Sequence, residues 1–519
     1  MPLSTPSARH LLHDRLFYGH LNVMLHHIST TKTTHSTPLK NTHSFHPRLR
    51  AVMSQLDMIA PRFVLNKGDV EIITSPVEFY ERLKLKIAHA EKRVFLSSLY
   101  IGKTQHELVA TITDALRAKP ELRVYILTDA LRGTREAPQH SSASLLSPLT
   151  EEFGNRVDIR MYHTPHLNGV KKSLLPVRIN EGWGLQHMKM YGFDDEIIMS
   201  GANLSSDYFT DRQDRYYHFK SQTLTDYYFS IQQAVSSLSY RIYASASESK
   251  FRMSWPTSNA SSEPHLNMQR FLSDALLLLE PLLKPRNLAP FEDKDEGSPT
   301  TVVYPVSQFT PLLVPDHSTE KPAVLRLLSL LDSPKIQWTF TAGYFNMHPE
   351  IKKRLINSRA IGNVITAAPK ANGFYKSGGI SYYLPEAYLL LSKKFLVDVH
   401  ANQKEATISL NEWQRGIVNT PNGWSYHAKG LWISVPDETR PSVTMIGSSN
   451  YTRRAYSLDL ESNAIVVTKD EELKAQMANE VENLMLHTKR VTLEDFEKDE
   501  ERQISQWVQV ATKLVGRKL

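Results

Sequence analysis

The chain has 519 residues, of which 41% are hydrophobic and 22% charged; this balance predicts a globular protein, and the length predicts more than one domain. No cysteine is present, which excludes disulfides, thiolate metal sites and a thiol nucleophile. The net charge of +7 is concentrated in residues 1–50, which carry six basic residues against one acidic residue, so a broadly basic nucleic-acid surface is not favoured.

The first element in chain order is this basic head, residues 1–55. It is rich in Ser, Thr and His, and its Leu12, Leu16, Leu21 and Met24 fit one face of a helix. These features predict a mitochondrial transit peptide, with a disordered tail as the alternative. No run of 18 or more apolar residues occurs in the sequence, so we expect no membrane span.

Two stretches of the chain then repeat one order of elements. Each has a helix, a strand that ends near a tyrosine, and a second apolar strand. The expected members are Val77–Ala90, Arg93–Tyr100 and Leu122–Leu127, and then Ala323–Leu331, Gln337–Phe345 and Asn363–Ala367. This agreement predicts an internal duplication and an α/β fold with a central sheet in each half.

The repeat and the composition of the stretches between its copies predict the domain boundaries. We expect order to begin near Phe63 and one helix, Asn267–Leu283, to lie between the halves. The predicted units are a first half at 63–245, a connecting segment at 246–300, a second half at 301–490 and a C-terminal helical tail at 491–519.

Each half contains a His-x-Lys motif, followed by an apolar strand and a Gly-x-Asn or Gly-x-x-Asn element. The first copy comprises His187, Lys189, Asp194 and Asn203, and the second comprises His427, Lys429, Ser434 and Asn450. Residues two apart in a strand point to the same side, so each His and its Lys project together. The second copy has serine where the first has aspartate.

Two such units facing each other predict a phosphodiester site. The lysines would neutralise the phosphate oxygens, and two histidines can supply a nucleophile and a general acid at neutral pH. We assign His187 as the nucleophile, which gives a covalent phosphohistidine, and His427 as the acid and base. This scheme requires no metal ion, and any dependence on divalent ions is left open.

Longer strings around these motifs resemble a known family. They are SLYIGK (98–103), DALRGTRE (129–136), the segment 181–217, NGWSYHAKGLW (422–432) and IGSSNYTRRAYSLDLESNA (446–464). They resemble the phospholipase D superfamily and, within it, the phosphatidylglycerophosphate synthases of eukaryotic mitochondria. The resemblance implies a duplicated phospholipase D-like fold, with two mixed-sheet halves and the active site at their interface.

The resemblance also implies the reaction and its place. CDP-diacylglycerol would give its phosphatidyl group to sn-glycerol 3-phosphate, which yields phosphatidylglycerophosphate and CMP on the way to cardiolipin. The enzyme would lie peripherally on the matrix side of the inner mitochondrial membrane. The catalytic residues implied by position are His187, Lys189, Asp194, His427 and Lys429. Because Ser434 departs from the motif, Asp459 or Glu461 could orient the second histidine.

Further residues are predicted to bind substrate. They are Arg132 and Arg135 after the strand Leu122–Leu127, Arg453 after the second Asn, and Asn203, Asn450 and Glu461. The segment Ser97–Thr104 resembles the end of a phosphate-binding loop but lacks its glycine-rich turn, so ATP binding there is not expected.

Membrane contact is predicted from aromatic residues. Trp413, Trp424, Tyr426 and Trp432 gather around His427, and the stretch Phe374–Leu396 combines tyrosines with Lys393 and Lys394.

Three other functions stay open from the sequence: a hydrolase of the same superfamily, a phosphatidyltransferase with another acceptor, and a catalytically silent lipid-binding scaffold. A nuclease is disfavoured by the nearly neutral body of the chain. The sequence does not predict an oligomeric state.

Overall fold

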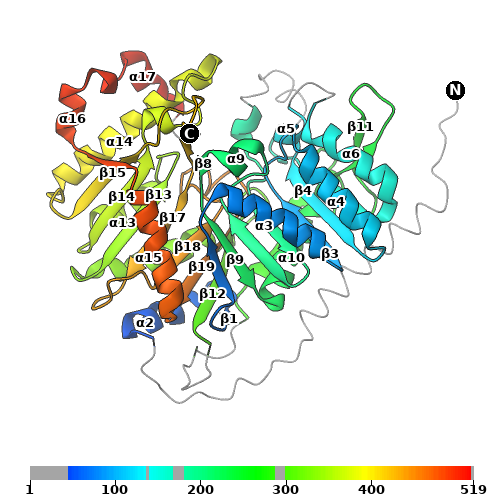
Figure 1. Ribbon diagram of the computed structural model, residues 1–519, viewed down its shortest axis with the longest axis horizontal. Coiled ribbons are helices and arrows are strands. Elements are labelled where there is room, and N and C mark those ends of the chain that lie inside the picture. The colour runs from blue at the N-terminus through cyan, green and yellow to red at the C-terminus, as the bar shows by residue number, and fades with distance from the viewer. Residues whose placement is uncertain (1–44, 136–139, 168–179, 287–290, 292–298, 516–519) are drawn as a thin grey trace.

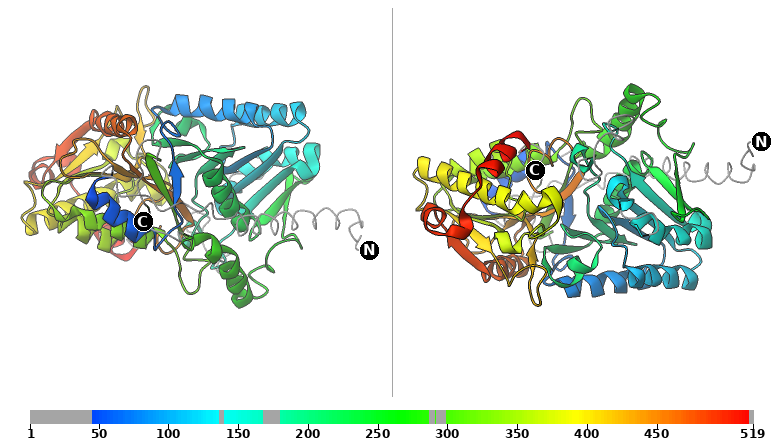
Figure 2. Two further views of the ribbon diagram at one scale, coloured as in Figure 1. Left: turned by 90° about the horizontal axis from the view of Figure 1, so that it is seen from below. Right: turned by 90° about the horizontal axis from the view of Figure 1, so that it is seen from above.

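The computed structural model describes residues 45–135, 140–167, 180–286, 291 and 299–515 (Figure 1). Two nine-stranded mixed sheets lie next to each other, and helices cover both faces of each (Figure 2). The predicted α/β class and the duplication are confirmed by the strand order, because both sheets contain three adjacent parallel strands, followed on one side by a run of antiparallel strands, four in the first sheet and five in the second.

The first sheet has the order β11-β10-β5-β4-β3-β6-β7-β9-β2. Its strands are β2 (Val70–Ile73), β3 (Arg93–Ser97), β4 (Arg123–Asp129), β5 (Val157–Tyr162), β6 (Met190–Phe193), β7 (Glu196–Ser200), β9 (Tyr216–Lys220), β10 (Tyr240–Ala244) and β11 (Phe251–Ser254). Its helices are α3 (Pro76–His89), α4 (His106–Ala118), α5 (Ala130–Gly133), α6 (Ser142–Phe153), α9 (Ser206–Thr210), α10 (Gln222–Ser236) and α11 (Met268–Leu283).

The second sheet has the order β1-β12-β19-β18-β17-β13-β14-β15-β20. Its strands are β1 (Phe63–Leu65), β12 (Thr301–Gln308), β13 (Gln337–Ala342), β14 (Ile361–Ala367), β15 (Ile408–Trp413), β17 (Lys429–Ser434), β18 (Val443–Gly447), β19 (Glu461–Thr468) and β20 (Thr488–Val491). Its helices are α2 (Pro47–Leu56), α12 (Glu320–Leu327), α13 (Pro349–Ile356), α14 (Leu384–Ala401), α15 (Glu471–Met485), α16 (Leu493–Lys498) and α17 (Gln506–Val515).

Local sequence explains why the helices begin where they do. The side chain of Ser75 caps α3 by accepting the amide of Glu78, and Pro76 occupies the first turn, where its missing N–H costs nothing. The side chain of Asn267 caps α11 in the same way, so the predicted helix Asn267–Leu283 is confirmed to within one residue.

Three large apolar cores and one small cluster lie within the described residues. One lies between the first sheet and α3, α4 and α6, and a second lies between the second sheet and α2, α12, α13 and α14. The third draws on both sheets and on α10, α11 and α15. Trp413, Tyr426 and Trp432 are at most 1% exposed in this shared core, so the prediction that they face a membrane is wrong.

The predicted start of order near Phe63 is also wrong. Helix α2 begins at Pro47, and its Leu49, Val52, Met53 and Leu56 are buried in the core of the second half. Strand β1 then pairs with β12 of the second sheet, although the sequence placed it in the first half. Residues 1–44 of the predicted transit peptide lie outside the described residues, and the end of the predicted segment 1–55 belongs to α2. Within the described residues, no helix is both long and apolar enough to cross a membrane.

Candidate active site

Each histidine stands just before a central strand, where the two sheets meet. His187 precedes β6, and its amide donates to the carbonyl of Leu460 in the second half at 2.9 Å. His427 precedes β17, and its amide donates to the carbonyl of Gln213 in the first half at 2.9 Å. Beside this contact, β8 (Arg212–Gln213; labelled in Figure 1) and β16 (Ser425–Tyr426) form a small parallel sheet that joins the halves. The backbone of each motif is therefore fixed by the other half.

The carboxylate that contacts each histidine also comes from the opposite half. Nδ1 of His187 lies 2.9 Å from Oε1 and 3.0 Å from Oε2 of Glu461. Nδ1 of His427 lies 2.6 Å from Oδ2 of Asp214. A carboxylate at Nδ1 holds the proton on that nitrogen and leaves the lone pair on Nε2 for chemistry. The halves therefore complete one site between them.

The carboxylates expected from the sequence are arranged differently. Glu461 does reach the site, but it contacts His187 rather than the second histidine. Asp459 instead binds Arg454 at 3.0 Å and accepts the amide of Leu185. Neither residue orients His427, whose partner Asp214 was not among the predicted site residues.

Asp194 does not lie at the site, so the structure contradicts its predicted catalytic role. It follows the far end of β6, roughly 20 Å along the extended chain from His187. Its carboxylate accepts the backbone amides of residues 91, 92 and 93 at 2.7–2.9 Å and so fixes the entry to β3. Ser434 occupies the matching place at the end of β17, which explains why a serine there leaves the second histidine unaffected.

Lys189 and Lys429 are buried beside the histidines. The Nζ of each donates to the carbonyl of the histidine two residues before it, at 2.7 and 2.6 Å. Gly201 leaves the space that this packing needs, because a Cβ there would stand 2.5 Å from Oδ1 of Asp214 and 3.1 Å from Nζ of Lys429. The glycine of the Gly-x-Asn element therefore permits the close approach of the two halves.

Asn203 and Asn450 follow β7 and β18 at matching positions, as the repeat predicts. Oδ1 of each is buried and lacks a hydrogen-bond partner among the described residues. Gly447 precedes Asn450 with φ of +151°, and a Cβ there would stand 2.3 Å from Oδ1 of Asn463. The glycine thus lets the end of β18 approach Asn463 of β19 without a clash.

Burial changes the protonation of the central groups. Desolvation first, and the charge of the neighbouring lysine second, lower the pKa of His187 and of His427 well below the usual value. Desolvation also lowers the pKa of Lys189 to about 7 and that of Lys429 to about 8, and it raises the pKa of Glu461 to about 7. Both histidines are therefore neutral at neutral pH.

The two histidines differ in what surrounds Nε2. The rings of Tyr208 and Tyr344 meet the His427 ring edge-on, with centroids 5.1 and 5.5 Å away. The Tyr208 hydroxyl lies 3.3 Å from Nε2 of His427 and accepts a hydrogen bond from Nδ2 of Asn203. Nε2 of His187 makes no hydrogen bond to the described part of the chain. Nε2 of His427 thus has a hydrogen-bond partner, whereas Nε2 of His187 is open to substrate.

The predicted arginines gather on one carboxylate. Arg135 binds Oε1 of Glu181 at 2.8 Å, and Arg132 lies 3.4 Å from Oε2 and stacks over the ring of Tyr100. Arg454 donates to the carbonyl of Glu181 at 2.9 Å. The predicted Arg453 points to solvent instead. Three guanidinium groups therefore surround a single glutamate.

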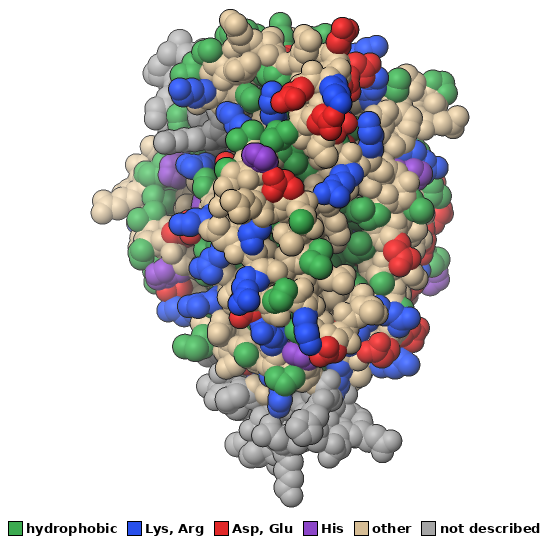
Figure 3. All heavy atoms as spheres, turned by 90° about the vertical axis from the view of Figure 1, so that its left-hand side faces the viewer, with side chains coloured by type: hydrophobic (Ala, Val, Ile, Leu, Met, Phe, Trp, Pro, Cys, Tyr) green, Lys and Arg blue, Asp and Glu red, His purple; other side chains and the backbone are tan. Residues whose placement is uncertain are grey.

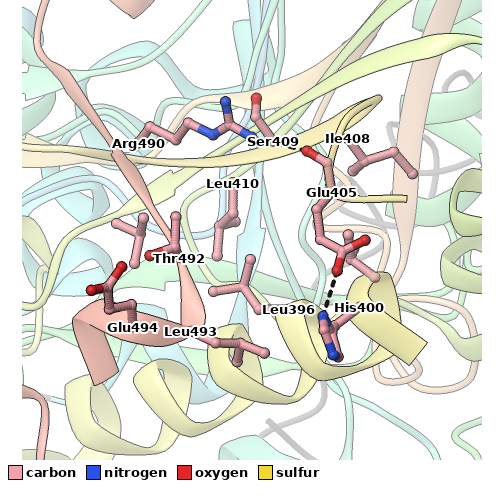
Figure 4. A pocket seen from close by; sticks show the side chains of 12 residues that line it. Leu396, His400, Glu405, Ile408, Ser409, Leu410, Arg490, Thr492, Leu493 and Glu494 are labelled. Atoms are coloured by element: carbon pink, nitrogen blue, oxygen red, sulfur yellow. Dashed lines mark hydrogen bonds and ion pairs between the residues drawn. The ribbon is translucent and has the colours of Figure 1, made fainter. Parts of the chain in front are cut away.

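A pocket of about 280 Å³ between α14, β15 and β20 is separate from this site (Figure 4). His400 and Glu405 in its wall pair with each other. None of its lining residues belongs to the predicted site.

Comparison with known proteins identifies the family. Residues 327–485 match a family model described as cardiolipin synthase, PLD-like domain. The CDP-diacylglycerol–glycerol-3-phosphate 3-phosphatidyltransferase of Saccharomyces cerevisiae is 53% identical over 88% of this chain and 89% of its own. The enzyme of that name in Schizosaccharomyces pombe is 41% identical over 90% and 97%, and the human mitochondrial one is 31% identical over 88% and 84%. The chain belongs to this phosphatidyltransferase family.

A solved structure supports the fold. The phosphatidylserine synthase of Haemophilus influenzae superposes with a TM-score of 0.66 over 90% of this chain and 97% of its own, at 18% identity. The phospholipase D-like architecture of this family member is therefore confirmed.

The repeat contained a signal for the missed carboxylate. In each half of this phosphatidyltransferase family member the carboxylate stands eleven positions after the Asn of the motif, at 214 after 203 and at 461 after 450. Each then leads into the next antiparallel strand, β9 or β19. Asp214 and Glu461 therefore occupy equivalent positions of the two repeats, although one is an aspartate and the other a glutamate.

We expect Asp214→Asn and Glu461→Gln each to lower kcat by about 10³-fold, because an amide can stabilise the wrong tautomer and cannot balance an imidazolium. Turnover of CDP-diacylglycerol measures this effect. Asp194→Asn is the matched control, for which we expect kcat within a few-fold of wild type and a lower melting temperature. A larger kcat loss in the control than in the other two variants would contradict the crossed pairing.

Proposed function

We propose that the protein transfers the phosphatidyl group of CDP-diacylglycerol to sn-glycerol 3-phosphate through a phosphohistidine on His187. The observation that carries this proposal is the crossed pairing, which gives two histidines with carboxylates at Nδ1 in one buried site. The open Nε2 of His187 supports its assignment as the nucleophile. The occupied Nε2 of His427 supports the role of proton carrier.

In the first step, Nε2 of His187 attacks the phosphorus that carries the diacylglycerol. The bond to the bridging oxygen breaks, and CMP leaves with a proton from protonated His427. The negative charge of the bound pyrophosphate offsets Lys189 and Lys429, so substrate binding favours protonation of His427.

In the second step, His427 takes the proton of the attacking hydroxyl of glycerol 3-phosphate. The new P–O bond forms, the N–P bond breaks, and His187 is restored.

The arginines around Glu181 are proposed to hold a substrate phosphate. Arg132 and Arg135 can exchange Glu181 for phosphate oxygens, since guanidinium groups bind phosphate in a bidentate manner. The predicted Asn203 and Asn450 would donate their amides within the same site.

The location is proposed from relatives. The human relative carries "mitochondrial" in its name, and we propose that this protein acts as a peripheral enzyme on the matrix side of the inner mitochondrial membrane.

The purified protein should be incubated with CDP-diacylglycerol in detergent together with glycerol 3-phosphate, with serine, or with water alone. We expect CMP release that depends on glycerol 3-phosphate. Equal CMP release in water would show that the protein is a hydrolase. CMP release that depends on serine would identify serine, rather than glycerol 3-phosphate, as the acceptor. No release under any condition would favour a lipid-binding scaffold.

The pH dependence should follow the buried lysines. Because the pKa of Lys189 is lowered to about 7 and that of Lys429 to about 8, their positive charge is lost as pH rises through this range. We therefore expect kcat/KM, which reports the free enzyme, to fall above pH 7 to 8. Bound phosphates raise the lysine pKa, so kcat should stay level to a higher pH. A kcat/KM that rises through pH 7 to 9 would contradict this assignment.

A further inference from the structure

The C-terminal helix α17 is amphipathic, and only part of its apolar surface is covered. Val508 and Thr512 are buried where α17 packs on α14. Trp507, Val510 and Leu514, spaced three and four residues apart, share another face and are 61%, 57% and 79% exposed. No described part of the chain covers this exposed face of α17.

Two exposed tyrosines extend this face. Tyr382 and Tyr383 end the short helix η5 (Gly379–Tyr383) directly before α14, and the ring of Tyr383 lies 6.4 Å from that of Trp507. We define the apolar patch as Tyr382, Tyr383, Trp507, Val510 and Leu514. Large contiguous exposed apolar surface commonly marks a contact with another protein or a membrane.

Lysines flank the apolar patch on the side of α14 and at the end of α17, whereas the segment 494–501 before α17 is acidic. The flanking lysines are Lys376, Lys393, Lys394 and Lys513, and none of them is buried. Between residues 374 and 397 the single carboxylate is Glu386, which accepts the amide of Ser505. Figure 3 shows lysine and arginine side chains spread over the neighbouring face of the molecule, with apolar side chains among them and acidic side chains toward the top.

A groove of about 640 Å³ runs between α14 and the segment that leads into α17. Its apolar floor includes Leu390, Val397, Phe496 and Ile504, and its cations are Lys352, Lys393, Lys394 and Arg502. Asp398 binds Lys352, and Glu412 binds Arg502 at 2.7 and 2.9 Å. Lys393 and Lys394 have no carboxylate partner in the described part of the chain.

The apolar patch lies at the same end of the molecule as the active site. Helix α17, at the upper left, and helix α9 and strand β8, near the middle, all lie in the upper half of Figure 1. The residues between them are in contact, because the ring of Tyr388 lies 5.6 Å from that of Tyr344, which in turn contacts His427. Tyr388 follows the exposed tyrosines by fewer than two helical turns.

We propose that the apolar patch and its flanking lysines seat the protein on an anionic phospholipid bilayer beside the mouth of the active site. Tryptophan and tyrosine favour the headgroup region, and an amphipathic helix with cations at its border binds acidic lipid surfaces. The groove accepts an acidic headgroup against Lys393 and Lys394. This proposal rests on the proposed function, because it takes the donor to be a lipid. It explains how that donor reaches a buried site without leaving the membrane.

Co-sedimentation of the full chain with vesicles tests the surface. We expect binding to vesicles of phosphatidylcholine with about one third phosphatidylglycerol, weaker binding to phosphatidylcholine alone, and loss of the difference at high salt. Leu514→Asp and Trp507→Asp should each weaken binding about tenfold or more. Lys393→Glu with Lys394→Glu should remove the preference for the anionic vesicles. The matched control is Leu277→Asp, on α11 and 71% exposed in the wild type, which should bind unchanged.

Rates of CMP release from two forms of the donor distinguish a failure of this proposal from a failure of the proposed function. Leu514→Asp should lower CMP release from CDP-diacylglycerol in vesicles by at least tenfold and leave release from a short-chain, monomeric CDP-diacylglycerol unchanged. Wild-type binding by both Leu514→Asp and Trp507→Asp would overturn the proposal, as would a change of oligomeric mass with no change in vesicle binding. Vesicle binding that follows the pattern above, with no CMP release from either substrate, would overturn the proposed function alone.

Discussion

Glutamine in place of His187 or His427 is expected to lower kcat by about 10⁵-fold or more, because each histidine performs a step that no neighbouring group can take over. The two variants should differ in the intermediate that they form. With donor labelled at the transferred phosphorus, His427→Gln retains the nucleophile and should accumulate labelled protein. His187→Gln should carry no label.

The label should be followed after a quench without acid, since the N–P bond of a phosphohistidine is acid-labile. The matched control is His400→Gln, whose imidazole is exposed and pairs with Glu405 in the separate pocket of Figure 4; it should keep wild-type kcat. Label on His187→Gln but not on His427→Gln would exchange the roles of the two histidines.

The largest expected loss of stability is at Arg215, a fully buried cation that joins the halves. Its guanidinium contacts Glu480 at 2.8 and 3.1 Å, donates to the carbonyls of Lys429 and Met445, and stacks 3.9 Å above the ring of Trp432. Arg215→Met would leave the mostly buried carboxylate of Glu480 without its cation. We expect a loss of about 3–5 kcal/mol in the free energy of unfolding.

Thermal unfolding should show this as a fall in Tm of roughly 5–10 °C. Adding Glu480→Gln to Arg215→Met should restore part of the loss, because the uncompensated charge is then removed. The matched control is Arg270→Met, at an exposed position on α11, which should change the unfolding free energy by less than about 0.5 kcal/mol. Equal Tm values for the two single variants would contradict the bridging role of Arg215.

The sequence predicts those features that depend on short-range pattern. The alternation of apolar residues predicts the central strands β3, β4, β13 and β14 to within a few residues, and the period-two rule places each lysine beside its histidine. The repeat of these patterns was enough to predict two similar sheets. It could not predict β1, whose three residues pair with β12 more than 200 positions later.

The parts that were missed depend on how the halves dock. Asp214 and His427 are 213 positions apart, and no local pattern connects them. Asp194 was assigned to the site because it follows Lys189 in the motif, yet a strand carries it to the opposite end of the sheet. Trp413 and Trp432 show the same limit, since aromatic residues that fill a core between two halves have the composition of residues that face a bilayer.

Crossed pairing has a consequence for assembly. If the two repeats were separate chains, each would hold a histidine without its carboxylate, and a working centre would exist only at concentrations that support dimers. Fusion into one polypeptide makes the association of the two halves intramolecular. The linker then sets the effective concentration of one half around the other, and this concentration does not depend on protein abundance. The same tether removes the exact twofold symmetry that identical subunits would impose. It thereby lets one imidazole become the nucleophile while its counterpart carries protons.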